Sequence, residues 1–158
     1  MNVGRLLRII CSRIVLSHFL TGIYDRVDLS SSGSTSLGKQ GEKAAERYLL
    51  RRGWIVVDRG FSARGGEIDL IAIDGKTVVF VEVKTRSSDR KGHPTEAVTF
   101  EKQSHITRTA YSYLSKNRLD ECSFRFDIIS IIWPDTDQAP AIEHYPNAFE
   151  AVGDFQLV

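Results

Sequence analysis

The chain contains little cysteine. Of its 158 residues, only Cys11 and Cys122 are cysteines, and neither has a partner at the spacing of a metal-ligand motif. Two isolated cysteines are typical of proteins that work in a reducing compartment. We therefore expect a cytoplasmic protein without a cysteine-based metal site.

The sequence also lacks a long hydrophobic run. Its longest clean apolar stretch, residues 14–23, is interrupted by three polar residues and is too short and too polar to span a bilayer. A signal peptide is a weak alternative, because no small-x-small cleavage site precedes Asp25. Residues 1–29 fit a basic amphipathic helix that contacts a membrane or a partner, or a poorly ordered extension.

Two common catalytic patterns are missing. Gly33 to Lys39 reads G-x-x-x-x-G-K, but Gln40 follows where a magnesium-binding hydroxyl is required, and no apolar strand precedes it. We therefore reject a phosphate-binding loop. No Ser/His/Asp arrangement is present, and we expect His93 and His105 at the surface because they have no ligand spacing.

Net charge is close to zero, at +1, but the charges are unevenly distributed. Residues 39–118 hold 16 Lys/Arg and 10 Asp/Glu, whereas residues 119–158 hold 8 acidic residues and one arginine. A basic segment around an acidic cluster suits a polyanionic ligand, although a mixed solvated surface would fit as well.

Hydrophobic periodicity predicts an α/β domain. Gly41, Ala44, Ala45, Tyr48 and Leu49 follow helical spacing, and Thr99 resembles an N-cap. The expected elements are a helix over 37–52, a strand over 54–58, a basic loop over 59–66, a hairpin over 65–84, a polar loop over 85–94, a helix to Asn117, a strand over 124–133, an edge strand over 141–145 and a turn over 147–149. This order, α-β-β-β-α-β-β, predicts a mixed sheet of about five strands flanked by helices.

One domain accounts for most of the chain. We expect an extension with a Ser/Gly-rich linker over residues 1–36, a folded domain over 37–151 and a short tail over 152–158. No internal repeat and no second domain is visible in the sequence.

The hairpin over 65–84 is the most informative stretch. Asp74-Gly75 is typical of a two-residue turn, which would set Ile73 opposite Lys76, Asp69 opposite Phe80 and Glu67 opposite Glu82. One face is then wholly apolar, and the other is apolar near the turn but charged at its far end. The apolar face comprises Ile68, Leu70, Ala72, Val79, Val81 and Val83, and the charged end comprises Glu67, Asp69, Glu82 and Lys84.

Charges on a buried hairpin suit phosphodiester hydrolysis. Mg²⁺ is bound by one or two carboxylates, and Asp69 and Glu82 lie diagonally across the expected hairpin with side chains able to converge. Lys84, on the same face as Glu82, could contact an attacking water or the charge that develops on phosphorus. A partly buried Glu82–Lys84 ion pair with Asp69 at a turn is the alternative without catalysis.

At these residues the sequence resembles the YraN family of predicted endonucleases, which are related to Holliday junction resolvases in the PD-(D/E)xK nuclease superfamily. The motifs that carry the resemblance are Gly38-x-x-Gly41-Glu42-x-x-Ala45-x-x-Tyr48-Leu49, Gly66-Glu67-Ile68-Asp69-Leu70-Ile71, Val79-Phe80-Val81-Glu82-Val83-Lys84, Glu96-Ala97-Val98, Lys102-Gln103 and Phe126-Asp127. The resemblance covers Leu37 to about Ala151 and implies a restriction endonuclease-like core. Ile68 stands where the superfamily has proline, and residues 1–36 match nothing in the family.

The resemblance also implies roles for individual residues. Asp69, Glu82 and Lys84 take the catalytic positions, and Glu42 joins Asp69 and Glu82 as a ligand of Mg²⁺ or Mn²⁺. Glu67 and Gln103 are supporting candidates, with core hydrogen bonding as the alternative for Gln103. Loop cations are candidate phosphate contacts, although such residues are usually only solvated: Arg64, Arg86, Arg90 and Lys91.

Two functions follow as expectations. The first is a divalent-metal-dependent endonuclease acting on DNA, with branched or repair and recombination intermediates as candidate substrates and RNA as an open alternative. The second is a non-catalytic module that keeps the fold and binds nucleic acid or a protein partner. Resolvase-like proteins often work as dimers, so a homodimer is a further expectation.

Overall fold

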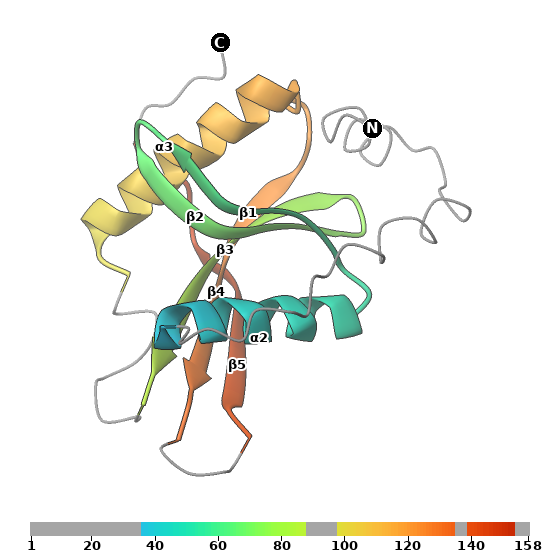
Figure 1. Cartoon of the computed structure of the whole chain (residues 1–158). Helices are drawn as coiled ribbons and strands as arrows, with labels where there is room; N and C mark the ends of the chain where they lie inside the picture. Colours follow the sequence, from blue (N-terminus) through green and yellow to red (C-terminus); the bar gives the residue numbers. More distant parts are fainter. Residues whose placement is uncertain (1–35, 88–97, 135–138, 154–158) are drawn as a thin grey trace.

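The computed structural model describes residues 36–87, 98–134 and 139–153 as one α/β unit (Figure 1). Its elements are α2 (Leu37–Arg51), β1 (Ile55–Ala63), β2 (Gly66–Asp74), β3 (Thr77–Arg86), α3 (Phe100–Asn117), β4 (Phe124–Ile132) and β5 (Ala141–Phe149). The predicted fold class and element order are confirmed. The expectations for residues 1–35 and for Arg90, Lys91 and His93 lie outside the described residues.

All five strands form one mixed sheet in the order β1-β2-β3-β4-β5. Only β3 and β4 are parallel, and α3 connects them; the other neighbours are antiparallel. Helix α2 packs against one face of the sheet around Ala45 and Leu49, and α3 packs against the other around Tyr113 and Leu114 (Figure 1). Among the described residues, no helix is long and apolar enough to cross a membrane.

Both helices begin at the side chain of a capping residue. Ser36 Oγ accepts a hydrogen bond from the Lys39 N–H, and Thr99 Oγ1 accepts one from the Lys102 N–H at 3.3 Å. These caps satisfy donors that have no partner within the first helical turn. The predicted N-cap Thr99 is therefore confirmed, and Ser36 belongs to the helix start rather than to a free linker.

Three predicted strand ends are wrong. Strand β3 continues to Arg86, two residues into the loop expected over 85–94. The loop expected over 59–66 is largely strand, because β1 continues to Ala63 and pairs with β2 as far as Gly66. The outer half of β1 has little apolar signal, because Arg59, Gly60 and Ser62 are polar or small and are exposed. The turn expected over 147–149 is also strand, because β5 continues past Pro146 through a bulge that lies opposite Asp127 of β4. Proline is tolerated there because β5 is an edge strand.

The β2–β3 turn lies one residue later than predicted. Asp74 pairs with Thr77, so the two turn residues are Gly75 and Lys76 rather than Asp74-Gly75. Gly75 has φ +59° and Lys76 has no positive φ, as in a type II′ turn with glycine first. The pairing register therefore shifts by two residues. For the paired residues, 70–74 and 77–81, this keeps the side chains on their predicted faces but changes their partners across the strands.

The outer end of the β1–β2 hairpin curves over α3 (Figure 1). The β2–β3 ladder ends at the Leu70–Val81 pair, whereas the β1–β2 ladder continues to Gly66. On the N-terminal side of Leu70, β2 stays paired with β1 but no longer pairs with β3. Ile68 consequently packs in the core cluster on the α3 side, not with Leu70 on the α2 side as predicted. This separation of β2 from β3 creates the space in which the predicted site residues meet.

Gly41 sets the distance between α2 and β3. A Cβ atom at this position would lie 1.7 Å from Thr85 Oγ1, whereas a Cβ at Gly38 would meet no atom within 4 Å. We expect Gly41→Ala to lower the free energy of unfolding by about 1–3 kcal/mol, because α2 must move away from the sheet. Gly38→Ala, its matched control, should be neutral or stabilising by up to about 1 kcal/mol. Urea denaturation measures both, and equal effects would contradict this account.

Candidate catalytic and metal-binding site

The separation of β2 from β3 exposes a backbone donor that Asp69 satisfies. Asp69 Oδ2 accepts a hydrogen bond of 2.6 Å from the Val83 N–H, just beyond the last ladder pair. Extending the ladder by one residue places Asp69 opposite Glu82, rather than diagonal to it as predicted. The Asp69 carboxylate therefore substitutes for a missing strand partner, and its position is fixed by the backbone of β3.

Glu82 is the most buried acid of the site, with 4% of its surface exposed. Its Oε1 accepts a hydrogen bond of 2.7 Å from Lys84 Nζ, which lies two residues along the same face of β3. Its Oε2 is buried and has no hydrogen-bond partner among the residues that the structure describes. Burying one unpaired carboxylate oxygen is costly, which makes Glu82 Oε2 a candidate ligand atom.

A second lysine, which is not among the predicted site residues, also contacts Glu82. Lys102 Nζ of α3 lies 3.2 Å from Glu82 Oε1. Lys102 is the third residue of its helix, where the helix dipole disfavours a positive charge. Two features of the sequence could have pointed to Lys102. They are its unfavourable position in the first turn of α3 and its place in the Lys102-Gln103 family motif.

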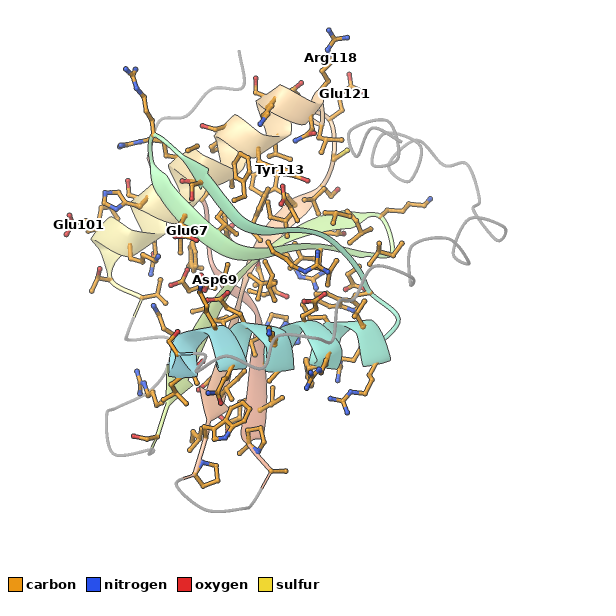
Figure 2. The ribbon with its side chains drawn as sticks, in the orientation of Figure 1. Glu67, Asp69, Glu101, Tyr113, Arg118 and Glu121 are labelled. Atoms are coloured by element: carbon orange, nitrogen blue, oxygen red, sulfur yellow. The ribbon has the colours of Figure 1, made fainter. Side chains whose placement is uncertain are left out.

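The acids lie close enough for their charges to interact. Burial, the Glu82 charge and the Glu42 charge raise the pKa of Asp69 to about 7, although the Val83 N–H and Lys102 oppose this rise. Burial and the Glu67 charge raise the pKa of Glu42 above its usual value, although the Lys39 charge acts to lower it. In Figure 2, Asp69 lies between α2 and α3, and Glu67 lies further towards α3. These pairwise charge interactions link Glu42, Glu67, Asp69 and Glu82, which we call the acidic cluster.

The supporting candidates differ in their placement. Glu67 is exposed and pairs across the strands with Ser62, so the predicted opposition of Glu67 and Glu82 is wrong. Gln103 Nε2 donates a hydrogen bond of 3.0 Å to the Val98 carbonyl, which holds the start of α3. Arg64 is exposed in the β1–β2 turn, and Arg86 is half-buried at the end of β3. Their contacts with nucleic acid stay predictions.

The donor chemistry of the cluster fits Mg²⁺ or Mn²⁺. Carboxylate oxygens are the preferred protein ligands of these cations, and Mg²⁺ needs only one or two because it retains waters. The unpaired Glu82 Oε2 and the mutual repulsion of Asp69 and Glu82 would both be relieved by a cation. Within the described residues, no three His, Cys, Asp or Glu side chains stand in a metal-holding arrangement. At Glu82 Oε1, the ammonium groups of Lys84 and Lys102 supply the positive charge.

Asp127 is a second buried acid, with a different environment. It is fully buried and accepts hydrogen bonds from Arg125 Nε at 3.0 Å and from the Asn147 N–H at 2.9 Å. His144 Nε2 lies 2.8 Å from its Oδ2. Although burial acts in the opposite direction, the hydrogen bonds from His144, Arg125 and Asn147 hold the pKa of Asp127 below its usual value. With both oxygens satisfied, Asp127 holds the β4–β5 bulge together and offers no ligand atom.

Comparison with known proteins places these residues in a family. The model of "Uncharacterised protein family UPF0102" matches residues 41–131. The UPF0102 protein of Geobacter metallireducens is 53% identical over 116 residues, which cover 73% of this chain and 93% of that protein. The UPF0102 protein of Trichlorobacter lovleyi is 45% identical over 123 residues, which cover 77% of this chain and 96% of that protein. The chain therefore belongs to the uncharacterised protein family UPF0102, which is the YraN family that its motifs resemble.

Proposed function

We propose that this protein is a divalent-metal-dependent endonuclease that hydrolyses phosphodiester bonds of DNA. Branched DNA and repair or recombination intermediates are its candidate substrates, and RNA is the alternative. One observation carries the proposal: a buried glutamate with an unpaired oxygen, Glu82, lies beside Asp69 and two lysines where β2 and β3 separate. A fold alone gains nothing from this arrangement, because it leaves buried charge incompletely paired.

Each residue of the cluster has a chemical task in the proposal. Asp69 and Glu82, with Glu42 from α2, would hold Mg²⁺ or Mn²⁺. The bound ion would neutralise phosphate charge and supply a nucleophile from water at neutral pH. The Val83 N–H fixes the Asp69 carboxylate, so this ligand needs little reorganisation.

Lys84 supplies the fixed positive charge. Its ammonium donates to Glu82 Oε1 from the same strand face and is three-quarters buried, with 26% of its side chain exposed. From this position it can donate a hydrogen bond to an attacking water or to a phosphate oxygen as negative charge develops. Its removal should therefore reduce the chemical step more than substrate binding.

The test is cleavage by the purified full chain with Mg²⁺ or Mn²⁺. Linear, nicked and four-way DNA and matched RNA substrates should reveal metal-dependent products. Glu82→Gln should reduce the rate by about 10²–10³-fold or more, because it removes a charged group at the reacting centre. Intact substrates throughout the panel would contradict the proposal. Equal cleavage by Glu82→Gln would identify a contaminating nuclease.

A non-catalytic binding module is the second candidate function. The basic segment over residues 39–118 and the absence of a metal-holding trio among the described side chains both favour it. It predicts DNA binding with a steep salt dependence and no uptake of divalent ions by calorimetry. For either function, we also propose that the protein is cytoplasmic and forms a homodimer. Gel filtration with light scattering tests the dimer.

A further inference from the structure

Glu82 Oε1 has two ammonium partners that differ in how firmly they are held. Lys84 Nζ lies at 2.7 Å and belongs to the same strand, whereas Lys102 Nζ lies at 3.2 Å and reaches across from α3. The Lys102 side chain is also more exposed, at 35% against 26% for Lys84. Of the two, Lys102 is the partner that can leave Glu82 with the smaller loss of packing and hydrogen bonding.

The backbone of Lys102 is fixed, so only its side chain needs to move. Its N–H donates to Thr99 Oγ1, and the neighbouring Gln103 Nε2 ties the helix start to the Val98 carbonyl. A lysine side chain is a compact charge on a flexible four-carbon stem. Lys102 can therefore exchange one anionic partner for another while α3 stays in place.

We propose that Lys102 is a displaceable counter-ion of Glu82, which leaves Oε1 when a divalent cation at the unpaired Oε2 neutralises the carboxylate and then binds a phosphate oxygen of the substrate. This inference rests on the proposed function, and it names a positioning residue for the same site. In the metal-free protein, Lys102 neutralises Glu82 together with Lys84. Once Glu82 holds the cation, the Lys102 ammonium has lost its partner at the point where an anionic substrate enters.

The inference also accounts for the charge arrangement of the cluster. Lys102 lowers the cost of placing Asp69 and Glu82 together, and it does so from a helix position that disfavours a cation. A purely structural counter-ion would be better placed in a strand, as Lys84 is. If Lys102 first neutralises the acids and then binds the substrate, its place on α3 rather than on β3 is explained.

The first measurement is Mn²⁺ affinity of the full chain by calorimetry, without nucleic acid. Lys102→Met should tighten the Kd about three- to tenfold, since the cation no longer competes with this ion pair. Lys102→Arg, which keeps the charge, should stay within about twofold of the parent. Lys116→Met is the matched control, because it removes a lysine near the other end of the same helix, and its Kd should be unchanged.

The second measurement is nucleic-acid affinity with saturating Mn²⁺ at several salt concentrations. It compares the chain with and without Lys102→Met, both carrying Lys84→Met so that the nucleic acid is not cleaved during the measurement. The variant should bind more weakly, and its slope of log K against log salt should fall by about 0.7–0.9 because one phosphate contact is lost. Lys116→Met should keep the parental slope.

The outcomes separate this inference from the proposed function. An unchanged or weaker Mn²⁺ Kd in Lys102→Met overturns the inference alone, because Lys102 then does not compete with the cation. A parental salt slope in that variant does the same, because Lys102 then makes no phosphate contact. Absence of Mn²⁺ binding in the parent and in every variant overturns the proposed metal site, and this inference with it.

Discussion

Asp127→Ala should lower the free energy of unfolding by about 3–5 kcal/mol, the largest stability loss expected in this chain. The side chain is fully buried, and it is the common acceptor for Arg125, His144 and the Asn147 N–H. Alanine would leave the Nε–H of the partly buried Arg125 guanidinium and the Asn147 N–H without their acceptor. Urea denaturation followed by circular dichroism measures the loss.

Asp74→Ala is the matched control for that experiment. Asp74 also accepts a hydrogen bond from Arg125, at 2.9 Å, but its side chain is 41% exposed. Exposed ion pairs of this kind contribute about 1 kcal/mol or less. If Asp127→Ala cost no more than Asp74→Ala, the buried network would not be what holds β5 against β4.

The contrast between Asp127 and Glu82 marks the difference between a structural acid and a site acid. Both lie on neighbouring parallel strands and both are buried. Asp127 has every oxygen satisfied, whereas Glu82 has a buried oxygen with no partner in the described part of the chain. In sequence the two are similar, since each is an acid within an apolar strand. Only the surroundings that the fold supplies distinguish them.

The central hairpin was predictable in its main features. Alternating apolar residues predict both strands, and the charges at one end predict where Asp69, Glu82 and Lys84 meet. The register was wrong by two residues because Asp74-Gly75 and Gly75-Lys76 are both acceptable two-residue turns. A shift of two residues preserves the faces, so the predicted cluster survived the error in its pairing.

Lys102 could not be predicted from hairpin geometry. It lies eighteen residues after Lys84 on a helix, and its contact with Glu82 depends on how α3 crosses the sheet. Ile68 was misplaced for a related reason, since period-two alternation assumes that β2 stays paired with β3 beyond Leu70. Long-range packing decides where Lys102 and Ile68 lie, and local sequence patterns carry no information about that packing.

Asp69→Asn should stabilise the metal-free protein at pH 8 while abolishing metal-dependent cleavage. The pKa of Asp69 in the folded protein is about 7, above its ordinary value of 3.8 in an unfolded chain. The folded state therefore binds this proton more tightly, and the corresponding stability is present below pH 3.8 and is lost as the pH rises through 7. Asparagine removes the ionisation and retains an oxygen that can accept from the Val83 N–H.

We expect the stability gain of Asp69→Asn over the parent to be about 1–3 kcal/mol at pH 8 and to disappear towards pH 4. Urea denaturation in EDTA at several pH values measures this difference between Asp69→Asn and the parent. Saturating Mg²⁺ should stabilise the parent and not Asp69→Asn, which would reverse their order. A variant that is less stable than the parent at pH 8 in EDTA would show instead that the Asp69 carboxylate serves the fold, and the case for a metal ligand at this position would be lost.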